Sequence, residues 1–167
     1  MTERIVPSLW DFIAQRFRNT VKGLTESELA YRLSPEDYSV SETAWRALGA
    51  CERWSAVLGG ATTSEEALEM SPRSVDLIQA ASDRYPPGQF PESMPDDANR
   101  ILERTDDVLA TVAAHLVELG PSERIGQYRT WWGDSYNGNE IVARILWTMG
   151  YADGQIHLML SMYRQST

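Results

Sequence analysis

Residues 39–58 read SVSETAWRALGACERWSAVL, a stretch that contains both the start and the buried face of a long helix. At its start Ser39 and Glu42 form a capping box, because each side chain can bond to the backbone N–H of the other residue. Apolar residues then recur at steps of three and four, which places them on one helical face: Val40, Ala44, Ala47, Cys51, Trp54 and Leu58. The stretch therefore predicts an amphipathic helix that ends near residue 58, before Gly59 and Gly60.

Three other stretches show the same helical spacing. The first begins near Pro7 and weakens at Gly23, the second spans about residues 96–119, and the third runs over about residues 139–164. Their inward positions are Trp10, Ile13, Phe17, Val21 and Leu24; Ala98, Ile101, Thr105, Val108, Val112, His115 and Leu119; and Ile141, Ile145, Thr148, Ala152, Ile156, Met159 and Tyr163.

The remaining segments are short or irregular. Thr25 and Glu28 form a second capping box, which predicts a short helix through Leu33. Residues 61–95 are the least regular part, with a helix expected around residues 74–84. Almost no strand is expected anywhere in the chain. We therefore expect an all-α fold, a four-helix bundle with one long irregular connection between helices 2 and 3, in a single domain over residues 1–167.

The composition excludes several classes of partner. A formal net charge of -9, from 15 basic and 24 acidic residues, disfavours nucleic acid and anionic membrane surfaces. No window approaches the roughly 20 apolar residues of a membrane span, and no signal peptide is evident. Cys51 is the single cysteine, so an intramolecular disulfide is not expected. These features predict a cytoplasmic protein.

Two short motifs resemble a known family. Tyr38-Ser39-Val40-Ser41-Glu42, which leads into Glu52-Arg53-Trp54, resembles the opening of the second helix in the DinB-like family, also called the damage-inducible or thiol-transferase bundle superfamily. Near the C-terminus, Gly154-Gln155-Ile156 resembles its His-Arg-Gly-Gln element. The helix order and the long connection agree with this resemblance along nearly the whole chain.

The resemblance implies a metal site that this chain does not keep. The family uses three histidines, one on the second helix and two on the fourth at an i, i+4 spacing, which lets two imidazoles share one ion. The matching positions here are Arg46, Thr148 and Ala152. Arginine stays protonated, alanine has no donor atom, and a threonine hydroxyl alone is a poor ligand. We therefore expect no metal, no cofactor and no catalytic residue at this place.

The two histidines leave an alternative open. His115 is interpreted as an edge-of-core or capping residue, and His157 as the partner of Asp153 in a surface ion pair. Alternatively, Asp153 and His157 could belong to a relocated metal site, with His115, Cys51 or Glu52 as further ligands. That arrangement would make the chain a metal-dependent thiol S-transferase-type enzyme.

Arg46 also has two interpretations. It could form a solvated i, i+4 pair with Glu42, or its guanidinium could enter the place of the metal and bind a carboxylate or phosphate. In the second case we expect Trp45, Arg46, Thr148, Ala152 and Gln155 to line a ligand pocket. Thr148 and Ala152 are most simply interpreted as core packing, because small residues let two helices approach closely.

Two further features bear on the surface. Gly150 and Gly154 each lower helix propensity by about 1 kcal/mol, which suggests close contact with another helix, either in this chain or across a homodimer interface. The family resemblance also implies self-association. The aromatic loop with Trp131, Trp132 and Tyr136 is expected to fold onto the end of the helices or to cover a pocket.

The sequence thus favours a binding or interaction protein over an enzyme. The function expected is that of a metal-free DinB-like bundle, a homodimer, that either binds a small ligand, such as an acidic one, in the residual groove or acts through association with a partner. The alternatives are the enzyme with relocated ligands and a regulatory module that binds a protein through an exposed apolar patch.

Overall fold

The computed structural model describes residues 5–70, 75–81 and 84–166, and most of these residues are helical. Within these ranges the long helices are α1 (Ile5–Val21), α3 (Val40–Leu58), α6 (Ala98–Glu118) and α8 (Gly138–Ser166). Shorter helices join them: α2 (Glu26–Ala30), α4 (Ser64–Met70), α5 (Val75–Ala80) and α7 (Pro121–Ile125). The strands β1 (Gln127–Arg129) and β2 (Ser135–Asn137) pair antiparallel just before α8. The prediction of a mainly helical chain is confirmed.

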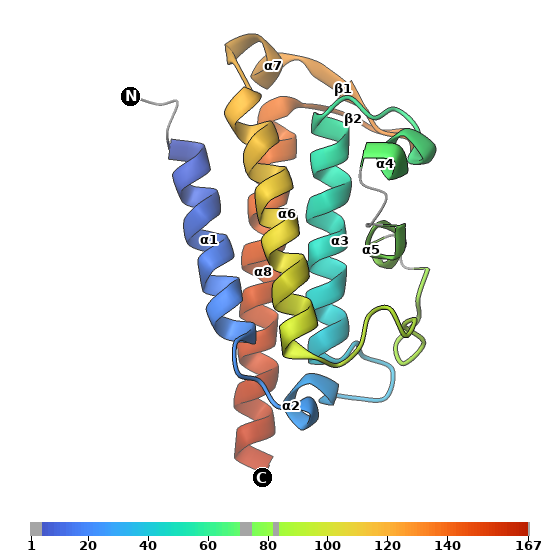
Figure 1. The fold of residues 1–167 in the computed structure, drawn as a ribbon, viewed down its shortest axis with the longest axis vertical. Coiled ribbons are helices and arrows are strands. Elements are labelled where there is room, and N and C mark those ends of the chain that lie inside the picture. Colours follow the sequence, from blue (N-terminus) through green and yellow to red (C-terminus); the bar gives the residue numbers. More distant parts are fainter. Residues whose placement is uncertain (1–4, 71–74, 82–83, 167) are drawn as a thin grey trace.

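The long helices lie side by side (Figure 1). α3 packs against α6 and α8, and α1 packs against the same two helices. α1 and α8 run in one direction, whereas α3 and α6 run in the other (Figure 1). Among the described residues, no helix is apolar over a length that could cross a membrane.

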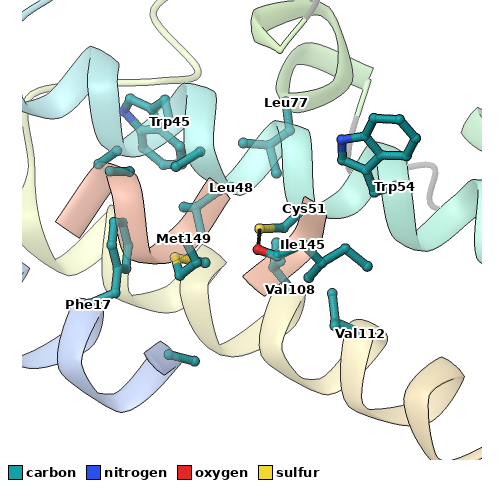
Figure 2. Close-up of a cluster of buried hydrophobic side chains, with 14 of the residues drawn as sticks. Phe17, Trp45, Leu48, Cys51, Trp54, Leu77, Val108, Val112, Ile145 and Met149 are labelled. Carbon is teal, nitrogen blue, oxygen red and sulfur yellow. Dashed lines mark hydrogen bonds between the residues drawn. The ribbon is translucent and has the colours of Figure 1, made fainter. Parts of the chain in front are cut away.

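A continuous apolar core fills the space between the long helices (Figure 2). Phe17 of α1, Leu48 of α3 and Met149 of α8 are fully buried there. The thiol of Cys51 donates to the carbonyl oxygen of Ile145 over 3.7 Å, which joins the middle of α3 to α8 (Figure 2). The apolar stripes predicted from the sequence therefore supply most of this core, although six of the predicted inward residues are only partly buried: Ile13, Leu24, Ala98, His115, Thr148 and Tyr163.

Both predicted capping boxes are present. The Ser39 hydroxyl accepts a bond from Glu42 N–H, the Glu42 carboxylate accepts one from Ser39 N–H, and α3 ends at Leu58 as expected. Thr25 and Glu28 cap α2 in the same way, but the prediction that this helix continues through Leu33 is wrong. α2 ends because the backbone of Tyr31 is extended. The carbonyl oxygen of Tyr31 accepts the N–H of Val40, the first residue of α3, instead of a bond within α2.

The long connection between α3 and α6 covers one side of α3. Within the described residues the helix expected around residues 74–84 is α5 over Val75–Ala80, while residues 74 and 82–83 lie outside the described part. α5 approaches α3 at Gly49, where an added Cβ would lie 1.8 Å from the carbonyl oxygen of Leu77. Only glycine allows this contact between the helix and the backbone of the connection.

The buried carboxylate of Glu42 also joins the long connection to the N-terminus of α3 through hydrogen bonds. This carboxylate accepts the backbone N–H of Gly88 at 2.7 Å and two bonds from the Arg32 guanidinium at 2.7 and 3.1 Å. Burial raises the pKa of the Glu42 carboxyl, but these bonds and the one from Ser39 N–H outweigh it and hold the pKa below its ordinary value of 4.5.

Gly49→Ala is expected to destabilise the protein by about 1–3 kcal/mol, because the methyl group collides with backbone that must move away. The measurement is the free energy of unfolding in urea. Gly150→Ala is the matched control, since an added Cβ there meets nothing within 4 Å and a helical alanine is favoured by about 1 kcal/mol. An equal gain in stability from both substitutions would contradict the close contact between α5 and α3.

Glu42→Gln is expected to lower the free energy of unfolding by about 1–3 kcal/mol at pH 7, because charged hydrogen bonds are weakened. A carboxyl whose pKa is lowered by folding stabilises the fold above its unfolded pKa and loses this effect as the pH falls through the folded pKa. The difference between the two proteins should therefore shrink as the pH falls below about 4.5. Glu103→Gln, which removes an exposed carboxylate, is the control. A difference that stays constant with pH would show that the Glu42 charge contributes nothing.

Candidate functional site

A groove of about 310 Å³ runs between α3 and α8. Each helix contributes side chains at steps of three and four, so the groove follows the seam between one face of α3 and one face of α8. Its described lining consists of Thr43, Arg46, Ala47, Ala50, Arg53 and Trp54 of α3, Ala81 after α5, and Arg144, Trp147, Thr148, Tyr151, Ala152 and Gln155 of α8.

The groove follows the one strip of α3 that is not buried. Between Val40 and Leu58 every residue is buried except Thr43, Arg46, Ala50 and Arg53, which recur at steps of three and four. All four line the groove. The polar groups of this strip therefore meet solvent, or a ligand, at the groove.

The structure brings together four of the five residues predicted to line a ligand pocket. Arg46, Thr148, Ala152 and Gln155 all lie on this groove, although they come from segments about a hundred positions apart. Ala152 is buried, whereas Thr148 is partly exposed. Ala152 is therefore packed in the core, as one interpretation expected, whereas Thr148 is only partly covered by its neighbours.

Trp45 does not belong to this groove, so its assignment to the pocket is wrong. Successive residues on a helix are about 100° apart, and Trp45 consequently points to the neighbouring side of α3. It is buried there, and its indole N–H donates to the carbonyl oxygen of Pro95 at 3.2 Å. It lines a different cavity, together with Leu77 and Met94 of the long connection.

Arg46 is partly buried and lies over an aromatic ring. Its guanidinium carbon is 4.0 Å from the centre of the Tyr38 ring, a cation–π contact that holds the planar group at the groove. Glu42, the partner considered for Arg46 on the same helix, is bound by Arg32 through both of its carboxylate oxygens.

Two more arginines that the sequence reasoning did not select lie on the same groove. Arg53 lies over the Trp132 ring at 4.4 Å, and Arg144 lies over the Tyr136 ring at 4.3 Å. Arg53 follows Arg46 by seven positions, a spacing that places both on one face of a helix. Arg144 precedes Thr148 by four positions, so helical spacing also places Arg144 on the same face of α8 as Thr148.

Trp54 joins these two arginines to the aromatic loop. Its ring packs edge-on against Trp132 at 5.1 Å and Tyr136 at 5.2 Å, and both arginines also lie near its face. The loop is thus folded onto the ends of α3 and α8, which is one of the two arrangements expected. It does not cover the groove, but it fixes the side chains at one end of it.

The electrostatic character of the groove is opposite to that of the chain. The described lining contains three arginines and no aspartate or glutamate, in a protein with a formal charge of -9. Thr43, Thr148 and Gln155 add uncharged donors. Guanidinium groups next to hydroxyl and amide donors, with rings beside them, are suited to a small anion that carries an apolar part.

The residues considered for a relocated metal site are divided among different contacts. His115 Nδ1 lies 2.7 Å from the Ser55 hydroxyl, and Cys51 is buried against Ile145, which raises the pKa of its thiol far above the usual range. Among the described residues, no group of three or more His, Cys, Asp or Glu side chains could hold a metal ion.

His157 lies beside Asp153, as the surface-pair interpretation expected, but the carboxylate has closer partners. Asp153 is buried and accepts bonds from the Thr20 hydroxyl at 2.5 Å and from Arg16 at 3.1 Å, whereas His157 Nε2 is 3.7 Å away. Both closer partners belong to α1. Asp153 therefore fastens α1 to α8.

Comparisons of the chain with models of known protein families and with curated proteins find no match.

Proposed function

We propose that this chain is a DinB-like four-helix bundle that lacks the family's metal and binds a small anionic ligand, a carboxylate or a phosphate, between α3 and α8. The observation that carries the proposal is the groove with three arginines and, in its described lining, no acidic residue. Three arginines at one crevice of an acidic chain offer cationic groups that could attract an anion.

The resemblance adds independent support. The positions matched to the family's three histidines are Arg46, Thr148 and Ala152, and these three residues lie on one groove. A chain with the family's bundle would place these positions together, with arginine and two short side chains where the family holds a metal. The short side chains leave room beside the long guanidinium.

The lining favours binding over catalysis. In the described part of the groove there is no His, Cys, Asp or Glu that could act as a general base or as an activated thiol. The threonine hydroxyls therefore have no adjacent base in this lining to make them nucleophiles. Their chemistry suits hydrogen bonding to a ligand oxygen.

A ligand would contact two kinds of surface in the groove, the charged arginines and an apolar wall of aromatic rings. Arg53 of α3 and Arg144 of α8 both lie beside the Trp54 ring, and Arg46 lies seven positions before Arg53 on the same face of α3. An anionic group in the groove could therefore accept charged hydrogen bonds from both helices. Trp147 and Tyr151 stack on one another with ring centres 5.0 Å apart. These rings offer a flat apolar wall for the rest of the ligand.

Phenyl phosphate, which joins a phosphate to a ring, tests the proposal by isothermal titration calorimetry. Arg46→Ala and Arg144→Ala are each expected to weaken binding by about 10- to 100-fold, because a hydrogen bond to a charged group contributes about 1.5–3 kcal/mol. The melting temperature should change little, because cation–π contacts at partly exposed sites contribute only about 0.5–1 kcal/mol.

Two controls separate this site from general attraction of anions. Arg100→Ala removes an exposed arginine of α6 outside the groove and should leave the affinity unchanged. Phenol, which has the ring without the charge, should not bind measurably. If wild-type protein binds neither phenyl phosphate nor benzoate, or if Arg100→Ala weakens binding as much as Arg46→Ala, the groove is not an anion site.

A further inference from the structure

A second cavity, of about 310 Å³, lies on the side of α3 that the long connection covers. α5 and α6 both pack against α3, and all three helices line the cavity together with residues 93–94 of the connection. Three buried residues of the lining, Trp45, Leu77 and Met94, form an apolar floor. The indole N–H of Trp45 already donates to the carbonyl oxygen of Pro95, so this ring offers the cavity only apolar surface. The floor suits an apolar group of a ligand.

The rim of the cavity carries charges of both signs. Four charged residues of α6 line it and share one face of that helix, at steps of three, one and three positions: Arg100, Glu103, Arg104 and Asp107. Each arginine is paired with the carboxylate three positions later, at 3.1 and 2.7 Å. Only 20% of the Arg104 side chain is exposed, whereas the other three are at least 53% exposed. Arg104 is therefore the charge of α6 that solvent screens least.

Asp76 of α5 adds a partly buried negative charge to the same lining. Its carboxylate accepts the Tyr85 hydroxyl at 3.2 Å and also accepts the Ser93 hydroxyl. Burial raises the pKa of the Tyr85 hydroxyl, and the neighbouring charge of Asp76 raises it further. Within the described part of the chain Asp76 forms no ion pair, although Arg104 lines the same cavity. Two uncharged hydroxyls thus hold the Asp76 carboxylate in place without neutralising it.

These features together restrict the class of ligand. A simple anion would meet three carboxylates against two arginines in the described lining, and a simple cation would meet both arginines. An uncharged apolar molecule would cover the floor but would leave Asp76 less solvated and without a counter-charge. A small molecule with one charge of each sign beside an apolar side chain matches the carboxylate, the guanidinium and the floor at once. A free α-amino acid with an apolar side chain has this chemistry.

We propose that this cavity is a second ligand site and that it binds a free α-amino acid with an apolar side chain, such as leucine. The ammonium group binds Asp76, the carboxylate binds Arg104, and the side chain packs on the floor. Arg104 keeps its bond to Asp107, because a guanidinium has five donors and can bind a ligand oxygen as well.

The cavity is separate from the groove between α3 and α8. Trp45 lines the cavity and Arg46, the next residue, lines the groove, so the two sites lie on neighbouring sides of α3. The amino-acid site therefore does not depend on the proposed anion site.

Isothermal titration calorimetry with L-leucine tests the site on the wild-type protein. Isoamylamine lacks the carboxylate and 4-methylpentanoate lacks the ammonium group, so each should bind about tenfold or more weakly than leucine. Glycine lacks the apolar side chain and should also bind about tenfold or more weakly. If leucine gives no heat of binding at millimolar concentration, or if any of the three analogues binds as tightly as leucine, the proposal is wrong.

Charge-removing variants test the two residues assigned to the ends of the amino acid. Asp76→Asn and Arg104→Gln should each raise the Kd for leucine by about 10- to 100-fold. Glu65→Gln, which removes an exposed carboxylate of α4 outside the cavity, is the matched control and should leave this Kd unchanged. Circular dichroism shows whether each variant is folded, and the three analogues decide if neither variant folds. An unchanged Kd in a folded Asp76→Asn, or an equal loss in Glu65→Gln, would overturn the assignment.

Two crossed titrations distinguish this site from the groove. Arg46→Ala should bind leucine as the wild type does, and Asp76→Asn should bind phenyl phosphate as the wild type does. Leucine binding that is lost in Arg46→Ala would place the amino acid in the groove and overturn the proposal. A wild-type protein that binds leucine but neither phenyl phosphate nor benzoate would refute the anion site and leave the amino-acid site standing.

Discussion

The burial of α3 is the constraint on which the rest of the structure depends. This helix packs against α6 and α8, against α5 of the long connection, and against the shorter elements α2, α4 and β1. A helix surrounded in this way must be apolar or hydrogen-bonded on nearly every side. The strip from Thr43 to Arg53 is the exception, and the groove exists because no element of the described chain covers that strip.

The same constraint explains why the arginines of the groove are ordered by aromatic rings. A guanidinium next to a buried helix cannot be solvated from all sides, and a ring face compensates part of the lost hydration. Tyr38 does this for Arg46, while the hairpin before α8 supplies Trp132 for Arg53 and Tyr136 for Arg144. The aromatic loop thus has a role at the site without covering it. These cation–π contacts restrict the rotation of the arginine side chains before a ligand binds, which lowers the conformational entropy lost on binding.

Two adjacent faces of α8 meet at the proposed site. One face meets α3 and contributes Thr148 and Ala152 to the groove, and the adjacent face carries exposed apolar side chains. Trp147 and Tyr151 stand at the boundary between the two faces. A ligand in the groove would therefore contact both the packed face of α8 and part of its exposed face.

The sequence by itself determined the long helices and their inward faces, because a helix depends on nearby residues: the Ser39–Glu42 box, the periodic apolar residues and the terminal glycines act within a few positions. It also grouped Arg46, Thr148, Ala152 and Gln155, through helical spacing joined to a family resemblance. Only the tertiary structure decided that Trp45 faces the long connection, that Arg32 holds Glu42, and that Arg53 and Arg144 complete the groove. These contacts join segments far apart in the chain, and a helical period fixes which residues share a face but not which partner that face meets.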